Sequence, residues 1–304
     1  MADIPEEELM NSGHNACPGC GAAHAMRYML KALGKNTTVN IPACCWAVIP
    51  GVYPSRNLEV PLLYNAFETT GASSSGIRAA LRAKDIEDAE VKVVGFAGDG
   101  GTADIGIQAL SGAVERGTDT IQVMYDNEAY MNTGIQRSGA TPEGAWTTTT
   151  PVGSEKAWKK QPKKDMMEIM ESHNIPYAAT VNIAYPDLFI EKFRKAAEIE
   201  GPKFIHIYAP CPTGWRAKPS ASVKLGELAF KSKVFPLYEI EHGVYNIYKK
   251  PKEDNVIPVK DYLKTQGRFR HLPEKEVEKI QKNVDRKWER LLKKEKFTKE
   301  ELGE

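Results

Sequence analysis

Two groups of residues in this 304-residue chain have the types and spacing of cofactor ligands. The first is the run Gly98, Asp99, Gly100 and Gly101, joined by Asn127, which comes 28 residues after Asp99. Glycines let backbone N–H groups approach a phosphate, and the start of a helix favours its negative charge. Carboxylate, amide and backbone carbonyl oxygens are the ligands that Mg²⁺ prefers. The pattern therefore predicts a magnesium–diphosphate site, with a plain glycine-rich turn as the alternative.

The second group consists of cysteines. Cys17 and Cys20 form a Cys-Pro-Gly-Cys turn, Cys45 follows after 24 further residues, and Cys211 stands between two prolines. Four cysteines suit a [4Fe–4S] cluster and equally a closed zinc site, and their spacing does not separate the two. A [4Fe–4S] cluster can accept electrons from a carbanion intermediate, whereas zinc cannot. The predicted magnesium–diphosphate site therefore favours a cluster over zinc. Cys44 is chemically as able to bind metal as Cys45, and we interpret it as a small buried hydrophobic residue.

Apolar periodicity predicts the elements that position these residues. Strands are expected at 60–67, 91–97, 121–125, 177–183 and 203–209. Helices are expected at 22–33, 71–83, 103–115, 163–173 and 187–199. Alternating strands and helices indicate an α/β fold with a doubly wound parallel sheet. The glycine run and Asn127 then lie at the carboxyl ends of strands, where such sheets bind ligands.

Two regions depart from this alternation. Residues 135–163 are rich in Gly, Thr, Pro and Trp and predict a long ordered loop, which in a compact domain is often functional. After residue 233 the pattern loosens, until a charged helix runs from Glu274 to about Lys296. Its apolar positions fall at helical spacing, which indicates packing against a neighbour.

Composition narrows the function classes. Lys and Arg number 41 and Asp and Glu 40, so the charge of +1 gives no reason to expect nucleic acid or an anionic membrane as partner. No run reaches the roughly 18 apolar residues of a membrane span, and the acidic N-terminus lacks an apolar signal core. These features predict a cytoplasmic protein, in which the five cysteines serve metal or catalysis more than disulfides.

Longer strings make the chain resemble the β subunit of 2-oxoacid:ferredoxin oxidoreductases, most closely those of the pyruvate synthase type. They are residues 98–106, 124–136, 210–215 and 266–272. The resemblance implies thiamine diphosphate, Mg²⁺ and a [4Fe–4S] cluster in this subunit. It also implies a thiamine diphosphate-binding domain over 1–235 that carries the cluster cysteines, followed by a C-terminal extension over 236–304 whose charged helix packs against another subunit.

The resemblance also assigns roles to single residues. It gives Mg²⁺ the side chains of Asp99 and Asn127 and the Ala129 carbonyl. It lines the diphosphate with 98–101 and 127–132, and it makes Asn132 the catalytic residue that touches substrate. The cluster ligands that it implies are Cys17, Cys20, Cys45 and Cys211. The register around 48–54 selects Cys45 over Cys44, and the family places that loop beside the cofactor.

The implied reaction is the oxidative decarboxylation of a 2-oxoacid with coenzyme A to acyl-CoA, CO₂ and reduced ferredoxin, or its reverse. Pyruvate is the leading substrate. Residues 43–47 and 67–71 depart from the family pattern, so oxalate or a larger 2-oxoacid is the alternative. A non-oxidative decarboxylase or carboligase with a structural zinc is a further alternative. The implied partners are an α subunit with the pyrimidine domain and activating Glu, γ and δ-like subunits, and ferredoxin.

Other polar residues have plainer interpretations. Glu68 is expected to be a structural or interface residue, and His206, on an apolar strand, to be a core histidine with satisfied hydrogen bonds. Residues 268–271 are expected to form a subunit interface, with coenzyme A phosphates as the alternative. The lysines within 159–164 are expected to form a solvated face.

Overall fold

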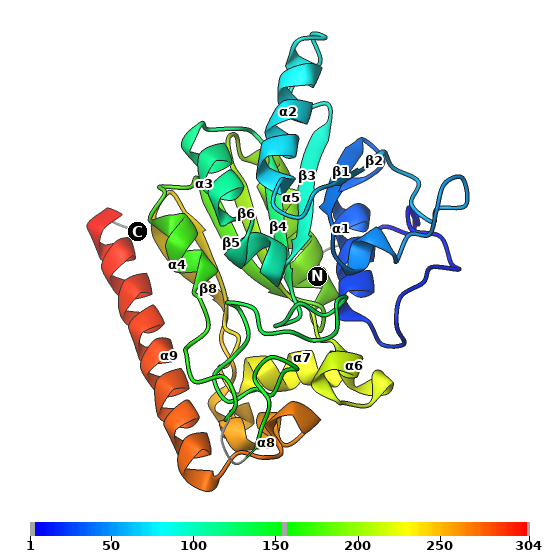
Figure 1. Cartoon of the computed structure of the whole chain (residues 1–304). Coiled ribbons are helices and arrows are strands. Elements are labelled where there is room, and N and C mark those ends of the chain that lie inside the picture. Colours follow the sequence, from blue (N-terminus) through cyan, green and yellow to red (C-terminus); the bar gives the residue numbers. More distant parts are fainter. Residues whose placement is uncertain (1–3, 154–156, 303–304) are drawn as a thin grey trace.

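The computed structural model describes residues 4–153 and 157–302, and these residues build one eight-stranded sheet (Figure 1). The strand order is β2-β1-β3-β4-β6-β5-β7-β8. The six strands from β2 to β5 are parallel, whereas β7 and β8 are added as an antiparallel hairpin. The strands are β1 Thr37–Pro42, β2 Leu62–Asn65, β3 Lys92–Gly98, β4 Ile121–Asp126, β5 Tyr177–Asn182, β6 Lys203–Tyr208, β7 Leu237–Glu241 and β8 Val244–Lys249.

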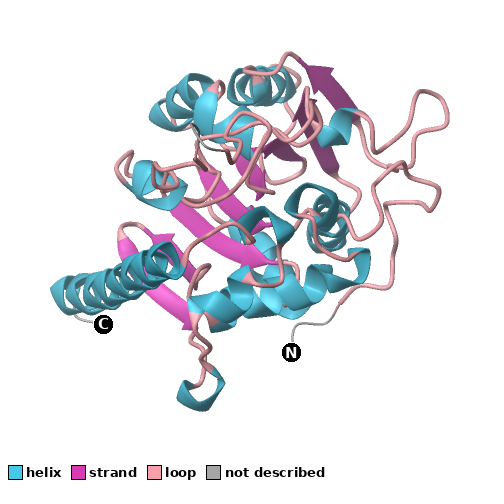
Figure 2. Cartoon of the chain, turned by 60° about the horizontal axis from the view of Figure 1, so that its bottom comes forward, coloured by secondary structure: helices cyan, strands magenta, loops and turns pink. Residues whose placement is uncertain are grey.

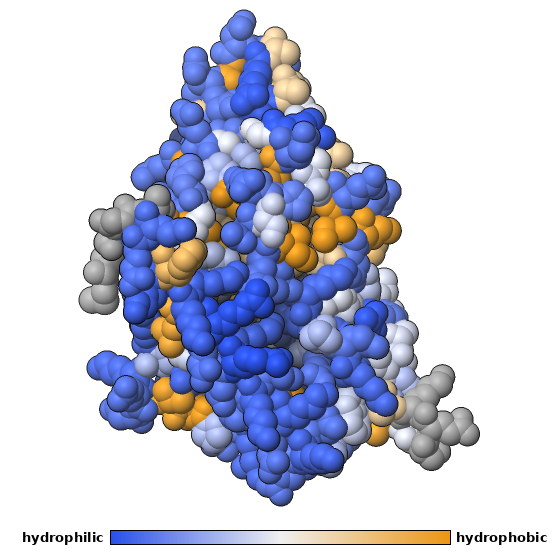
Figure 3. Space-filling model, turned by 90° about the vertical axis from the view of Figure 1, so that its left-hand side faces the viewer, coloured by the Kyte–Doolittle hydropathy of each residue, from blue (hydrophilic) through white to orange (hydrophobic). Residues whose placement is uncertain are grey.

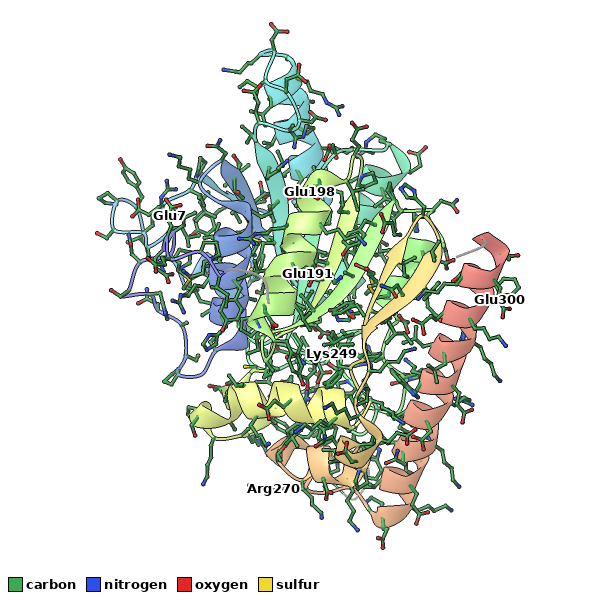
Figure 4. The ribbon with its side chains drawn as sticks, turned by 180° about the vertical axis from the view of Figure 1, so that it is seen from behind. Glu7, Glu191, Glu198, Lys249, Arg270 and Glu300 are labelled. Atoms are coloured by element: carbon green, nitrogen blue, oxygen red, sulfur yellow. The ribbon has the colours of Figure 1, made fainter. Side chains whose placement is uncertain are left out.

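Helices cover both faces of the sheet (Figure 2). Helices α2, α3 and α4 lie on the face toward the viewer in Figure 1, and α1 and α5 lie on the opposite face, seen in Figure 4. The longer helices are α1 Gly21–Leu33, α2 Thr70–Arg82, α3 Ile107–Glu115, α5 Pro186–Glu198, α7 Ser222–Lys231 and α9 Glu274–Leu302. The shorter ones are α4 Met166–Glu171, α6 Pro212–Trp215 and α8 Val259–Leu263. The predicted doubly wound α/β fold is thus confirmed, with an antiparallel edge added.

Alternating side chains of the strands divide the core into two layers. In β4, Val123 and Tyr125 join the cluster beneath α1 and α5, while Met124 joins the cluster beneath α3 and α4. Because both faces are covered, the central strands are buried along nearly their whole length, as is usual for parallel sheets. A third cluster, around Tyr208 and Trp215, lies beyond the carboxyl ends of the strands.

Four adjacent strands bring the candidate ligands to one edge of the sheet. Strands β1, β3, β4 and β6 are neighbours and run in parallel, so their carboxyl ends lie side by side. The loops that follow them carry Cys45, Asp99, Asn127 and Cys211 respectively. The order of the strands therefore collects residues that are up to 166 positions apart in the sequence.

Three elements differ from the sequence expectation. Strand β1 was not predicted because it contains Asn40, which is fully buried and donates to Thr70 O at 2.8 Å and Ser74 Oγ at 3.0 Å. The hairpin β7–β8 was not predicted because its residues read as irregular. The helix expected at 103–115 starts as a wide turn, η2 Gly100–Asp104, and continues as α3. The loop after β4 contains no helix or strand within 135–153 and 157–163, as expected.

The apolar positions of α9 face the chain's own body. Val277, Ile280 and Val284 pack on the cluster around Trp215, and Trp288 and Leu291 pack on the cluster beneath α4. The neighbour of this stripe is therefore the chain itself. The face that α9 helps to form is mostly hydrophilic, with only small hydrophobic patches (Figure 3).

Helix α9 also closes the open edge of β8. The backbone N–H groups of Tyr245 and Ile247 donate to Thr298 Oγ1 at 3.0 Å and to Glu295 Oε1 at 2.8 Å. The hairpin thus extends the main sheet, and α9 is bonded to the edge of that hairpin. A domain boundary at residue 235 stays a prediction. Among the described residues, no helix is both long and apolar enough to cross a membrane.

Candidate functional site

Asp99 and the turn after β4 place oxygen atoms opposite one another. The side-chain amide of Asn127 faces Asp99 Oδ1 at 2.9 Å and the Ala129 carbonyl oxygen at 3.0 Å. With the amide nitrogen turned toward them, both contacts are hydrogen bonds. With the amide oxygen turned toward them, that oxygen stands about 3 Å from each of the other two, the spacing of neighbouring ligands in an octahedron with Mg–O bonds of about 2.1 Å. The three predicted magnesium ligands are therefore together, and they fit the ion.

The surroundings of Asp99 also suit a cation. Its carboxyl group is fully buried, and burial raises its pKa well above the usual range, with the charge of Asp126 adding to the effect. The Ser138 hydroxyl donates to Asp99 Oδ2, and Lys163 lowers the pKa, but neither offsets the burial. A divalent cation that replaced the proton would relieve the cost of the buried charge.

A network of buried charges fixes the turn that carries Asn127. Glu128 adopts a left-handed conformation with φ of 68°, and its backbone N–H donates to Asp126 Oδ1 at 3.0 Å. The Glu128 carboxylate accepts from Lys163 at 2.8 Å and from Arg268, while Asp126 accepts from His206 at 2.7 Å. Burial acts to raise the pKa of Asp126, but Lys163 and His206 outweigh it and hold the pKa at about 2.

This network decides three expectations. His206 is a buried histidine with a hydrogen-bonded partner, as predicted. The solvated face expected for the lysines within 159–164 is wrong for Lys159, which donates to Thr141 O, and for Lys163, which is ion-paired with Asp126 and Glu128. The other two lysines of this segment are exposed, as expected. The interface expected for 268–271 is wrong for Arg268, which is buried, whereas Arg270 points outward at the far end of the molecule (Figure 4).

Aromatic rings explain why glycines follow β3. A Cβ on Gly100 would lie 2.1 Å from a ring carbon of Tyr130, and one on Gly98 would lie 3.2 Å from the Tyr125 hydroxyl. Gly101 approaches the Phe67 ring in the same way, at 3.2 Å. Packing therefore requires glycine at position 100 and leaves little room for a side chain at 98 and 101. That these residues also line a diphosphate stays a prediction.

The Cys-Pro-Gly-Cys turn packs against the segment that contains Cys211. Gly21 N, at the start of α1, donates to Pro210 O at 2.9 Å, and the Ser222 hydroxyl donates to the Gly19 carbonyl. Gly19 has φ of 74°, and a Cβ there would lie 2.1 Å from Pro219 O, so only glycine fits. These contacts bring the first and last predicted cluster ligands to the same corner.

The four predicted cluster cysteines influence one another electrostatically. Burial raises the pKa of Cys211 to about 11, with the nearby Cys20 and Cys17 contributing to the increase. Burial also raises the pKa of Cys45, with Cys20 and Cys211 among the neighbours that contribute. Within the ranges that the structure describes, however, no three His, Cys, Asp or Glu side chains converge closely enough to hold a metal ion. The four-cysteine cluster site therefore stays a prediction.

Cys44 and Asn132 approach one another. The Cys44 thiol is hydrogen-bonded to the Tyr125 hydroxyl, and burial raises its pKa. Asn132 is exposed, with its Nδ2 3.5 Å from the Cys44 carbonyl oxygen. Trp46 is fully buried and donates from Nε1 to Ala22 O at 3.1 Å, so this departure from the family pattern lies in the core.

The sequence did not single out Ser138, Thr141 or Trp215 as residues of the site. Thr141 donates to Glu128 O at 2.7 Å, and Trp215 donates from Nε1 to Asn127 O at 2.8 Å. These residues contact the turn after β4 from 13 and 88 positions away. The string 210–215 was part of the resemblance, but nothing in it indicated a contact with Asn127.

Comparisons with known proteins agree with this geometry. Residues 52–207 match the family described as thiamine pyrophosphate enzyme, C-terminal TPP binding domain. The chain is 52% identical over 293 residues to ketoisovalerate oxidoreductase subunit VorB of Pyrococcus furiosus, covering 95% of this chain and 94% of the relative. It is 52% identical over 282 residues to pyruvate synthase subunit PorB of Methanothermobacter marburgensis, covering 93% and 96%.

A solved structure shares the fold. It is a 2-oxoglutarate:ferredoxin oxidoreductase from Magnetococcus marinus with 2-oxoglutarate, coenzyme A and succinyl-CoA bound. The TM-score is 0.57 at 19% identity, and the match covers 74% of this chain and 81% of that one.

Proposed function

The chain belongs to the β subunits of the thiamine diphosphate-dependent 2-oxoacid:ferredoxin oxidoreductases, and from this premise we propose that it binds magnesium thiamine diphosphate and a [4Fe–4S] cluster in an enzyme that oxidises pyruvate. The proposed reaction converts pyruvate and coenzyme A into acetyl-CoA and CO₂ and reduces ferredoxin. The observation that carries the proposal is the convergence of Asp99 Oδ1, the Asn127 amide and the Ala129 carbonyl at the ends of β3 and β4.

The chain's own residues bind and orient the cofactor in this proposal. Asp99, Asn127 and Ala129 hold Mg²⁺, and the backbone of 98–101 approaches the diphosphate. Bound thiamine diphosphate supplies the carbanion chemistry that cleaves the bond between the keto carbon and the carboxylate of the substrate. We assign the contact with substrate to Asn132, which is exposed and has its Nδ2 3.5 Å from the Cys44 carbonyl oxygen.

Electron transfer is assigned to the region of the four predicted cluster cysteines, the cysteine corner. Cys17, Cys20, Cys45 and Cys211 bind the cluster, and the loop of Cys45 adjoins Cys44, whose thiol meets Tyr125 beneath Gly98. The two sites are thus neighbours along the same edge of the sheet. The activating Glu comes from an α subunit, and further subunits carry electrons to ferredoxin. This division of labour is consistent with the subunit names of the relatives.

Branched-chain 2-oxoacids are the second candidate substrates. The ketoisovalerate and pyruvate relatives are equally similar to the chain at 52% identity, so overall similarity does not choose between them. Trp46, one of the residues that differ from the family pattern, is buried in the core and so does not line the proposed substrate pocket. Pyruvate therefore remains the first candidate.

The test is anaerobic purification of the chain with its co-purifying subunits, followed by viologen reduction with a panel of 2-oxoacids. Coenzyme A-dependent reduction with pyruvate is the expected result. Faster reduction with 2-oxoisovalerate would replace pyruvate by the second candidate and keep the cofactors.

Metal analysis of the same preparation tests the cluster. We expect iron and acid-labile sulfide in equal amounts. One zinc per chain, with no viologen reduction by any 2-oxoacid, would instead support the non-oxidative decarboxylase or carboligase.

A further inference from the structure

One side chain joins the proposed magnesium site to the proposed cluster site. We propose that Trp215 is a positioning residue that couples the binding of magnesium thiamine diphosphate to the occupation of the cysteine corner. The inference rests on the proposed function, because it takes Asn127 as a magnesium ligand and Cys211 as a cluster ligand.

Trp215 contacts the turn after β4 at Asn127, the proposed magnesium ligand. Its indole Nε1 donates to the carbonyl oxygen of Asn127 at 2.8 Å, and the ring is fully buried. The neighbouring Gly214 packs against Met131 of the same turn, because a Cβ on Gly214 would lie 2.2 Å from the Met131 sulfur. Residues 214 and 215 thus hold the turn at two points on either side of Ala129.

The same short helix starts at a predicted cluster ligand. Cys211 is the N-cap of α6, and its sulfur accepts from Gly214 N at 3.4 Å. The backbone N–H of Trp215 donates to Cys211 O at 2.8 Å. One turn of helix therefore separates the Cys211 sulfur from the indole that holds Asn127. A change in the bonding of that sulfur acts directly on the Gly214 N–H.

Arg268 strengthens this connection. Its guanidinium lies 4.0 Å from the centre of the Trp215 ring and pairs with Glu128, the residue after Asn127. The Trp215 ring therefore contacts the arginine and also packs beside Tyr208, whose ring centre is 5.6 Å away. The indole has little freedom to move without moving the turn.

Coupling of this kind is reciprocal. If the cluster orders α6 and α6 orders Asn127, then cluster binding raises the affinity for magnesium thiamine diphosphate, and the reverse holds by thermodynamic necessity. The indole N–H carries the effect, so a ring of similar shape without that donor should remove it.

The experiment is a double-mutant cycle on the anaerobically purified complex, with Cys17→Ala and Trp215→Phe. Cys17 is the exposed cysteine, so its loss removes a cluster ligand and leaves α6 unchanged. The measurement is the dissociation constant of thiamine diphosphate at saturating Mg²⁺, with iron content determined on the same samples. Each single variant is expected to weaken binding about tenfold, and the double variant about tenfold as well.

Several outcomes would overturn the inference. Additive losses, near 100-fold in the double variant, would show that the two sites act independently. Unchanged affinity in Trp215→Phe would show that the indole N–H only supports the fold. A Cys17→Ala complex that keeps its iron would remove the ligand set on which the inference depends.

A control and a wild-type measurement separate the remaining possibilities. Tyr248→Phe also deletes a donor to a backbone carbonyl, that of Thr180, away from both sites, and should leave the affinity unchanged. Wild-type complex without iron, or without affinity for thiamine diphosphate, would overturn the proposed function together with this inference. Wild-type complex that binds both, with no coupling between them, would overturn the inference alone.

Discussion

Asp99 carries the only carboxylate among the three groups that converge on the proposed magnesium position. Replacing it by Asn keeps the shape of the side chain but removes the charge that a divalent cation requires. We predict that Asp99→Asn weakens the binding of magnesium thiamine diphosphate at least about 100-fold, beyond the usual effect of a residue that only supports a ligand. Cofactor titration followed by fluorescence measures the change.

Asp104→Asn is the matched control for Asp99→Asn. Asp104 lies five residues later, where it pairs with Lys164 at 2.7 Å and accepts from the Tyr130 hydroxyl at 2.8 Å. It does not contact Asn127, so its replacement should change the affinity less than about tenfold. Unchanged cofactor binding in Asp99→Asn would contradict the assignment of the magnesium ligands.

Cys44 and Cys45 are adjacent and offer a direct comparison. The Cys44 thiol interacts with the Tyr125 hydroxyl, whereas Cys20 and Cys211 lie near enough to Cys45 to raise the pKa of its thiol. We predict that Cys45→Ser loses the iron of the cluster and that Cys44→Ser retains it. Iron and sulfide analysis of the two variants decides the matter, and the reverse result would exchange the roles of the two cysteines.

At the residue scale, the sequence allowed prediction of those site residues whose role follows from their immediate neighbours in the chain. Asp99 and Asn127 could be found because each directly follows a buried strand. Lys163 and Arg268 were misjudged because the acid that neutralises each, Glu128, is 35 and 140 positions away. Sequence patterns carry no information about such distant partners, so a buried lysine or arginine reads as a surface residue.

At the scale of elements, the added hairpin is tied to α5 through Glu239 of β7. Its carboxylate pairs with Lys192 and Lys195, each at 3.1 Å, and accepts from the Tyr177 hydroxyl at 2.8 Å. Burial acts to raise the pKa of Glu239, but Lys192 and these other partners hold it below the usual range. The stabilisation is therefore complete above about pH 4.3 and is lost as the pH falls through the lower folded-state pKa.

We predict that Glu239→Gln lowers the free energy of unfolding by about 1–3 kcal/mol at pH 7, the cost of weakening hydrogen bonds to a buried charged group. The difference from wild type should shrink as the pH drops below about 4. Denaturant unfolding at pH 7 and pH 3.5 measures it. Glu241→Gln, at a more exposed ion pair with Lys195, is the control and should change stability by less than about 0.5 kcal/mol. An equal loss at both pH values would contradict the electrostatic explanation.

The wide turn after β3 depends on the contact between Gly100 and Tyr130. We predict that Gly100→Ala destabilises the protein by about 1–3 kcal/mol, because the new methyl group overlaps the ring. Gly76 is the control, since it lies in the middle of α2 with open space where a Cβ would be. Gly76→Ala should leave stability unchanged or raise it by about 0.5–1 kcal/mol. Thermal unfolding of both variants compares them, and equal effects would exclude the ring contact as the cause.

The elements themselves could be predicted wherever burial follows a simple rule. Helices α1, α2 and α5 and strands β3 to β6 begin and end within a few residues of their expected positions, because their apolar residues repeat at the helical or strand period. Strand β1 and the hairpin escaped because Asn40 and Glu239 are polar residues inside the protein. The Asn40 amide nitrogen donates to α2 and the Glu239 carboxylate pairs with α5, and no local pattern reveals these tertiary contacts.

At the scale of the whole molecule, the surface on the β2 side differs from the surface around α9. The connection between β1 and β2 projects from the body (Figure 1) and exposes Val52 and Tyr53, with 80% and 87% of their surface accessible. We predict that a partner subunit covers this connection, so that serine at both positions reduces co-elution of the subunits in size-exclusion chromatography. Phe297→Ser, at an exposed aromatic residue of α9, is the control. Dissociation by Phe297→Ser alone would move the contact to α9.

The two edge strands of the sheet, β8 and β2, differ in how well they are covered, and this difference affects how the chain behaves when it is purified alone. At one edge, Thr298 and Glu295 accept hydrogen bonds from backbone N–H groups of β8. The opposite edge is β2, a four-residue strand with Leu63 and Tyr64 partly exposed. Free backbone groups on such a border can template pairing with another molecule. We therefore expect the separated chain to aggregate from β2 as its concentration rises, and co-expression with its partners to keep it monodisperse in light scattering.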